Sequence, residues 1–225
     1  MVIDKNRIFD AVLSIKGTLP PGVTLEAAAK TRSLEEVETV IEAGVTHIGY
    51  NYVQEALPFI AAIGDRATWH MIGHLQRNKA KVVVENFDLV ETLDSWKLAQ
   101  TLERYCEEQQ KMLPVLLEIN SGREDNKTGV LPDHVDALVE QVSGLQYVHL
   151  VGLMTMGPIF GDPEESRPYF KTTRTIFERL SKTQLSNVEM RTLSMGMSNS
   201  YRVAVEEGAN LVRIGTAIFG ARDEN

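Results

Sequence analysis

Short runs of apolar residues recur along the chain, and a longer amphipathic segment separates most of them from the next. Each run is short enough to be a β-strand, and several are rich in β-branched residues. The runs are Thr24–Ala29, His47–Tyr50, Thr68–Gly73, Leu89–Leu93, Pro114–Asn120, Leu150–Met156, Thr192–Met197 and Leu211–Phe219.

Apolar residues between the runs recur with helical spacing. The first such helix has a capping box, Ser33 with Glu36, and a stop at Gly44. Weaker helical patterns cover residues 53–63 and 78–85, and a short helix over Ser198–Gly208 ends at a glycine. A helix followed by a loop into the fold is expected over 1–22. The clearest apolar stripes are Leu98, Leu102, Tyr105 and Cys106; Val135, Leu138, Val139 and Val142; and Phe170, Thr173, Phe177 and Leu180.

Eight strands alternating with helices predict an α/β protein with a parallel sheet. The two main solutions are a closed (β/α)8 barrel of the TIM type and an open doubly wound sheet. The open sheet predicts a glycine-rich turn after its first strand, but here that strand ends Ala28-Ala29-Lys30-Thr31. We therefore expect a barrel, formed as a single domain over residues 1–225.

The composition narrows the class of protein. The 225 residues are 43% hydrophobic, and 31 acidic against 23 basic residues give a net charge of −8. This charge argues against nucleic-acid binding, which needs clustered cations. The sequence has no apolar run long enough to span a membrane and no secretory signal, and its one cysteine, Cys106, excludes an internal disulfide. We expect a cytoplasmic protein with no membrane partner.

In a (β/α)8 barrel the reactive groups lie at the carboxyl ends of the strands. The first run closes on Lys30, after three alanines. A lysine at an apolar barrel mouth is partly desolvated, which favours the neutral amine that forms imines. On position alone, Lys30 is also compatible with a surface lysine at a strand end.

The seventh and eighth runs end in residues suited to a phosphate. Ser194, Gly196 and Ser198 lead into a helix start, and Gly215 and Thr216 follow the eighth strand, where barrels often hold phosphate. Each segment alone could instead be an ordinary cap or a packing glycine.

Arg213 alternates with Gly215 along the eighth strand and is therefore predicted to point into the barrel mouth. A guanidinium is rarely buried without a partner. An amine, a phosphate cradle and an inward arginine fit pyridoxal 5'-phosphate (PLP). Lys30 would form the Schiff base, and Arg213 would face the ring nitrogen.

Other candidates carry weaker signals. His70 and His74 have the i, i+4 spacing of a zinc helix, but the segment is predicted as a strand with no acidic third ligand, so we expect no metal site. Met154 and Met156 are interpreted as barrel filling and Cys106 as core. Asn51 could contact a ligand or cap the following helix.

Six segments of the chain, several of them long, resemble the pyridoxal phosphate homeostasis proteins (the YggS/PROSC family). These proteins are PLP-binding barrels of fold type III related to the N-terminal domain of alanine racemase. The six segments are Ala29-Lys30-Thr31, residues 51–55, 69–79, 152–156 and 193–198, and Val212 to Gly220.

The resemblance implies PLP as cofactor, PLP homeostasis (vitamin B6) as function and a monomer as the assembly. It also implies that PLP-requiring apoenzymes could be partners. It assigns the Schiff base to Lys30 and the ring contact to Arg213. The phosphate contacts would be Ser194, Ser198, Gly215 and Thr216, with Asn51, Ile72, His74, Met195, Gly196 and Met197 lining the site. Three positions, Ala29, Tyr50 and Ser200, depart from the family pattern.

Two functional hypotheses follow, with a third beside them. A guanidinium leaves the pyridine nitrogen unprotonated, so the ring is a poor electron sink and a PLP carrier with little or no turnover is favoured. The alternative is a weak PLP-dependent racemase or lyase with Tyr50 as acid, although the second domain of alanine racemase is expected to be absent. The third is a sugar-phosphate isomerase with Glu91 or Glu118 as the catalytic carboxylate.

Overall fold

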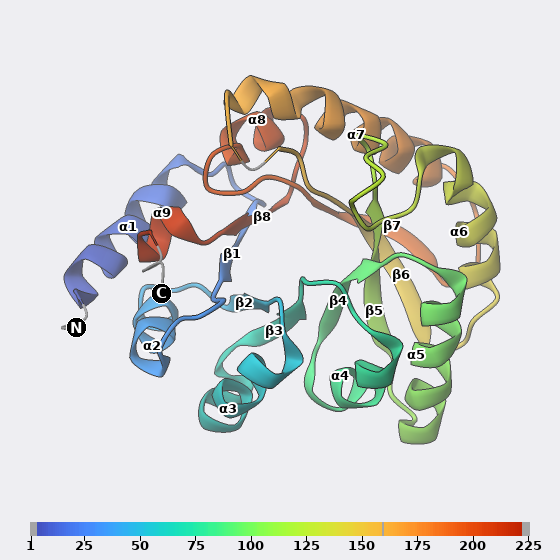
Figure 1. Ribbon diagram of the computed structural model, residues 1–225, viewed down its shortest axis with the longest axis horizontal. Helices are drawn as coiled ribbons and strands as arrows, with labels where there is room; N and C mark the ends of the chain where they lie inside the picture. The colour runs from blue at the N-terminus through green and yellow to red at the C-terminus, as the bar shows by residue number, and fades with distance from the viewer. Residues whose placement is uncertain (1–3, 159, 222–225) are drawn as a thin grey trace.

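Eight parallel strands close into a barrel, in the order β1 to β8, in a computed structural model that describes residues 4–158 and 160–221. The helices form a ring outside the strands (Figure 1). The predicted (β/α)8 fold is thus confirmed. The strands are β1 (Thr24–Ala28), β2 (His47–Tyr50), β3 (Thr68–Met71), β4 (Leu89–Leu93), β5 (Leu113–Ile119), β6 (Val148–Thr155), β7 (Val188–Ser194) and β8 (Leu211–Ile214).

Nine α-helices lie in the described ranges, and most connect one strand to the next. The helix that begins at the predicted capping box has both of its reciprocal hydrogen bonds, between Ser33 and Glu36. The helices are α1 (Lys5–Thr18), α2 (Leu34–Glu42), α3 (Val53–Ile63), α4 (Ala80–Asn86), α5 (Trp96–Gln109), α6 (Val135–Ser143), α7 (Arg167–Leu180), α8 (Tyr201–Glu206) and α9 (Thr216–Phe219).

The last two predicted strands differ most from the observed ones. The apolar run Leu211–Phe219 is a strand only to Ile214, and α9 begins after Gly215. β7 starts at Val188, where alternating burial replaces a continuous apolar run. The predicted helix over 198–208 begins at Tyr201, and residues 1–3 and 222–225 of the predicted domain lie outside the described part.

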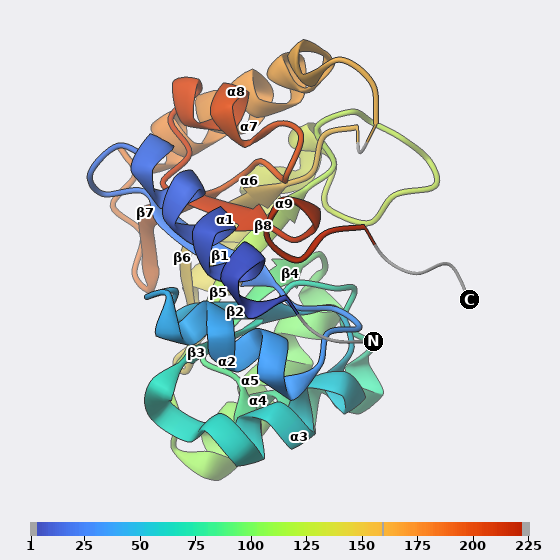
Figure 2. The ribbon, with the colours of Figure 1, turned by 90° about the vertical axis from the view of Figure 1, so that its left-hand side faces the viewer.

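The first and last strands pair with each other and close the barrel. Glu26 on β1 is in register with Arg213 on β8. Outside this seam, α1 packs beside α9 (Figure 2), and Arg7 donates to the Phe219 carbonyl at 2.6 Å. The segment that follows β8 is thereby fixed by the N-terminal helix.

The barrel interior has an apolar and a charged part. Leu89, Leu116, Val151 and Met154 form a small cluster, with Met156 packed against it, as predicted for barrel filling. The larger apolar core, which includes Cys106, lies between the strands and the helices. Among the described residues, no helix is long and apolar enough to cross a membrane.

At Gly152 the backbones of β6 and β7 lie close together. A methyl group there would lie 1.8 Å from the Thr192 carbonyl oxygen, which belongs to the backbone and cannot turn aside. We expect Gly152→Ala to lower the free energy of unfolding by at least about 3 kcal/mol, at the upper end of overpacking costs. Urea denaturation measures this.

Gly17 supplies the control for that variant. It lies inside α1 with no neighbouring heavy atom within 4 Å of an added methyl group, so Gly17→Ala should stabilise the protein by about 0.5–1 kcal/mol. Equal effects of the two variants would contradict the close approach at Gly152.

Candidate functional site

Lys30 follows directly after β1, at the carboxyl ends of the strands. The preceding residue, Ala29, is buried, and its N–H donates to the Gly49 carbonyl at 2.9 Å. The Lys30 side chain is half-buried, with Nζ 5.1 Å from the centre of the Tyr52 ring. The amine thus stands at the mouth of the barrel, held over an aromatic face.

The turn after Lys30 has a strained backbone and is held by hydrogen bonds from Arg32. Thr31 has φ +64°, a left-handed conformation that β-branched residues rarely adopt. Arg32 holds the turn, since its backbone N–H donates to Ala29 at 3.1 Å and its guanidinium donates to the Gly220 carbonyl at 2.8 Å. This clamp joins the lysine turn to the segment after β8.

Arg213 lies inside the barrel and is 4% exposed. Its guanidinium donates to the Ser194 hydroxyl and, at 2.9 Å, to the Thr155 carbonyl. Ser194 ends β7 and Thr155 ends β6, so the guanidinium lies at the level of the strand ends, just below the mouth.

The partner that makes this burial possible is Glu91 on β4. Its Oε2 lies 3.6 Å from Arg213 and accepts from the Ser194 hydroxyl at 2.6 Å. Its Oε1 lies 2.7 Å from Nδ1 of His70 on β3. Glu91 therefore joins two buried cationic groups.

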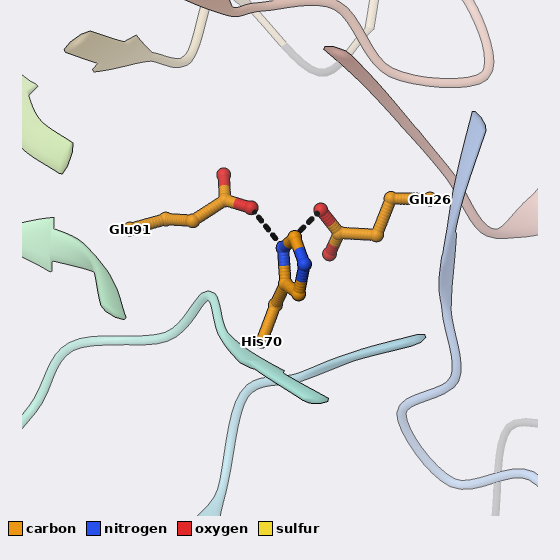
Figure 3. Close-up of side chains that lie close together, drawn as sticks. All are labelled: Glu26, His70 and Glu91. Atoms are coloured by element: carbon orange, nitrogen blue, oxygen red, sulfur yellow. Dashed lines mark hydrogen bonds and ion pairs between the residues drawn. The ribbon is translucent and has the colours of Figure 1, made fainter. Parts of the chain in front are cut away.

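A second carboxylate completes this interior cluster. Glu26, on β1, points toward His70 from the side opposite Glu91 (Figure 3), with Oε2 3.2 Å from Nδ1. All three side chains are at most 1% exposed. The Nε2 of His70 lies 2.9 Å from Nδ1 of His47, which is half-buried at the start of β2.

The cluster shifts the protonation of its members in opposite directions. Burial and repulsion by Glu91 raise the pKa of Glu26 above its usual range. Burial alone would raise the pKa of Glu91, but His70 and Arg213 outweigh it and lower that pKa. Burial likewise disfavours the charged form of His70, yet the two carboxylates raise its pKa. At neutral pH, Glu91 is thus the anion, and His70 and Arg213 are cations.

The loops after β7 and β8 meet at one side of the mouth. The Ser198 hydroxyl, half-buried, accepts from the Ala217 N–H at 3.1 Å, which ties the two loops together. Thr216 is exposed and Gly215 half-buried. A side chain at Gly196, where φ is +89°, would collide with α8, its Cβ only 2.6 Å from that of Ala204.

Two of the predicted site residues, Ser194 and Met195, turn their side chains away from the mouth. The Ser194 hydroxyl is engaged with Glu91 and Arg213 inside the barrel. Met195 is fully buried in the core between strands and helices, so only its backbone faces the loop. The Met197 carbonyl accepts from Tyr201 at 2.8 Å and opens α8.

The opposite side of the mouth carries the other predicted residues. Asn51 and His74 line a cavity of about 300 Å³ together with Tyr52. His74 is exposed, with Nδ1 3.3 Å from Asp94. Ile72 is buried, and its Cδ1 would lie 2.8 Å from a methyl group at Gly49, inside the barrel.

The position of Tyr50 contradicts the hypothesis that this residue acts as the acid of a racemase or lyase. It is 1% exposed and packs against Phe59 and Trp69, with ring centres 5.3 and 6.3 Å away, between the barrel and α3. Because Gly49 faces the interior, the next residue along the strand faces outward. Tyr50 cannot act as an acid at the mouth, and burial raises the pKa of its hydroxyl.

Glu118, the other carboxylate considered, lies near the end of β5. Its Oε1 accepts from the Thr128 hydroxyl at 2.7 Å, and Oε2 is buried without a hydrogen bond to any described residue. Burial raises the pKa of Glu118. Glu91 is committed to Arg213 and His70, which removes it as a free catalytic base.

Comparisons with known proteins agree on one family. Residues 3–223 match the family model described as alanine racemase, N-terminal domain. The pyridoxal phosphate homeostasis protein of Pasteurella multocida is 39% identical over 204 residues, covering 89% of this chain and 87% of its own. The protein of that name from Schizosaccharomyces pombe is 36% identical over 203 residues, covering 89% of this chain and 84% of its own.

Solved structures give the same result. PipY of Synechococcus elongatus with PLP bound superposes with a TM-score of 0.86 at 35% identity, covering 95% of this chain and all of that one. An alanine racemase of Clostridium difficile has a TM-score of 0.83 at 14% identity, covering 98% of this chain and 61% of its own, so it shares the fold. The chain therefore belongs to the pyridoxal phosphate homeostasis protein family, whose barrel is the alanine racemase N-terminal domain.

Proposed function

We propose that this chain binds PLP at the carboxyl ends of its strands and takes part in PLP homeostasis, with little or no turnover of its own. The observation that carries the proposal is the pairing of a lysine amine at the end of β1 with a buried, inward arginine on β8. PLP, when bound, supplies an aldehyde that reacts reversibly with a primary amine.

The donor set at the mouth suits this cofactor. Lys30 offers the amine, and Arg213 offers a guanidinium to the ring nitrogen. Ser198, Gly215 and Thr216 lie on the joined loops after β7 and β8, where a phosphate can approach the backbone closely. Asn51, Ile72, His74 and the backbone from Met195 to Met197 would line the rest.

Ser194 takes a different role in this proposal. Its hydroxyl bridges Glu91 and the guanidinium, so it orients Arg213 and leaves the phosphate to the other loop residues. A guanidinium cannot give up its proton in a protein, so the ring nitrogen keeps its lone pair. The arrangement binds the ring firmly while giving it little power as an electron sink.

The finer parts of the proposal concern partners and place. We infer that the protein holds PLP and releases it to apoenzymes, a role that the family's function and a site with weak catalytic power support. We propose further that it is monomeric and cytoplasmic.

Replacing Lys30 tests the site directly. Wild-type protein mixed with PLP should show the visible absorption band of covalently held cofactor, and borohydride should bleach it. Lys30→Ala should lose the band completely, because the variant lacks the amine that lies over the Tyr52 ring. Lys16→Ala, on α1, is the matched control and should keep the band. A band that survives in Lys30→Ala overturns the assignment.

Tyr50→Phe separates the carrier from a weak racemase. The hydroxyl has no hydrogen-bond partner in the described structure, so its removal should raise the free energy of unfolding by about 1 kcal/mol. We expect an unchanged PLP band and negligible α-deuterium loss from labelled amino acids in both proteins, followed by NMR. Exchange that Tyr50→Phe abolishes would restore the enzyme hypothesis.

Delivery makes a kinetic prediction. Loaded protein mixed with a PLP-free transaminase should activate it at a rate that rises with transaminase concentration, beyond the rate of PLP loss into buffer. Activation no faster than that loss would leave storage as the function and exclude direct hand-over.

A further inference from the structure

Glu26 is a buried carboxylate whose charge the cofactor site does not use. It is fully buried, and neither oxygen makes a hydrogen bond to any residue in the described ranges. The nearest polar hydrogen position, at Nδ1 of His70, serves Glu91, which lies 0.5 Å closer (2.7 against 3.2 Å). Among the described residues, Glu26 therefore shares His70 with Glu91 and has no hydrogen bond of its own. A buried carboxylate in that position costs several kcal/mol unless a proton or a bound cation neutralises it.

Three donors of the kind that bind metals converge at this point. One oxygen of Glu26, Nδ1 of His70 and one oxygen of Glu91 all lie within 4.8 Å of one another. The two carboxylates reach the imidazole from opposite sides (Figure 3). Metal–ligand bonds near 2.1 Å place tetrahedral donors roughly 3.4 Å apart. The oxygens of Glu26 and Glu91 lie 3.2 and 2.7 Å from Nδ1 of His70, so each needs to move away from that nitrogen by well under 1 Å.

Neighbouring residues orient two of the three donors, His70 and Glu91. His70 points Nε2 at Nδ1 of His47, which directs Nδ1 of His70 toward the carboxylates. The other oxygen of Glu91 accepts a hydrogen bond from the Ser194 hydroxyl. Residues that ligate metals are commonly held in place by such a hydrogen bond from an outer residue.

Space and access are both present. Gly49 leaves room for the Glu26 carboxylate, since a methyl group there would lie 1.9 Å from Oε1. A cavity of about 370 Å³ opens at the amino ends of the strands, and its lining includes Thr24, His47 and His70. The cluster is thus reached from the end of the barrel opposite Lys30.

We propose that Glu26, His70 and Glu91 form a binding site for one divalent transition-metal ion, entered from the amino-terminal end of the barrel. One imidazole and two carboxylates suit Zn²⁺ or Mn²⁺. The ion would take the place of the hydrogen on Nδ1 of His70, which leaves to solvent, and the two carboxylates would neutralise the charge of the ion. Water from the cavity would complete the coordination. The site is separate from the lysine mouth and needs no PLP.

Cobalt titration of the full chain, freed of PLP and of metal with a chelator, tests this site. We expect one equivalent of Co²⁺ to bind with visible d–d bands, and Zn²⁺ to displace it. Glu26→Gln keeps the shape and removes one ligand, so its affinity should fall at least about 100-fold, more than the loss on removing an outer partner. Glu118→Gln, a buried glutamate outside the cluster, should bind as the wild type does.

The wild type alone also gives a readout that does not depend on any variant folding. Zn²⁺ bound only by the native state should raise its thermal unfolding temperature, and excess chelator should reverse the rise. Binding of less than one equivalent, no thermal shift, or equal affinity in Glu26→Gln would each overturn the metal site and leave a proton as the occupant. Because PLP is absent throughout, these outcomes do not bear on the Lys30 site.

Discussion

The interior of this barrel depends on Glu91. Its two oxygens face different cations, Arg213 on one side and His70 on the other, and all three groups are buried. Removing the carboxylate would leave the Arg213 guanidinium without this counter-charge and His70 with Glu26 alone, in a medium where an uncompensated charge costs several kcal/mol. The Arg213 guanidinium, which we propose faces the cofactor ring, is therefore held from below by a residue that lies deeper in the barrel.

This anchoring divides the barrel into two ends with different chemistry. Above Glu91, Ser194 and the Thr155 carbonyl orient Arg213 toward the strand ends and the lysine turn. Below it, polar contacts run from Glu26 and His70 to His47 and the cavity at the amino ends of the strands. An apolar cluster around Leu116 and Met154 fills the remaining side, so the charges are confined to one part of the interior.

Hydrophobic period and turn chemistry were sufficient to predict the barrel, the order of its elements and the positions of Lys30 and Arg213. These two signals failed to predict the bounds of the last two strands. One apolar run contains both β8 and α9, which are separated at Gly215, and most of β7 alternates between half-buried and exposed residues without a continuous apolar run. Glu26 was missed because only the residues that close each strand were considered, although it shares the inward phase of Lys30. The prediction for Tyr50 was wrong because side chains alternate along a strand: Gly49 faces the barrel interior, so Tyr50 faces outward.

The seam between β1 and β8 joins the two most distant strands of the sequence. Arg7 and Arg32 further bind the N-terminal third of the barrel to the backbone at Phe219 and Gly220. During synthesis on the ribosome, β1 emerges early and β8 emerges last. The seam therefore forms only in chains that have been completed through β8, and shorter products leave one edge of β1 unpaired and open to association with other chains.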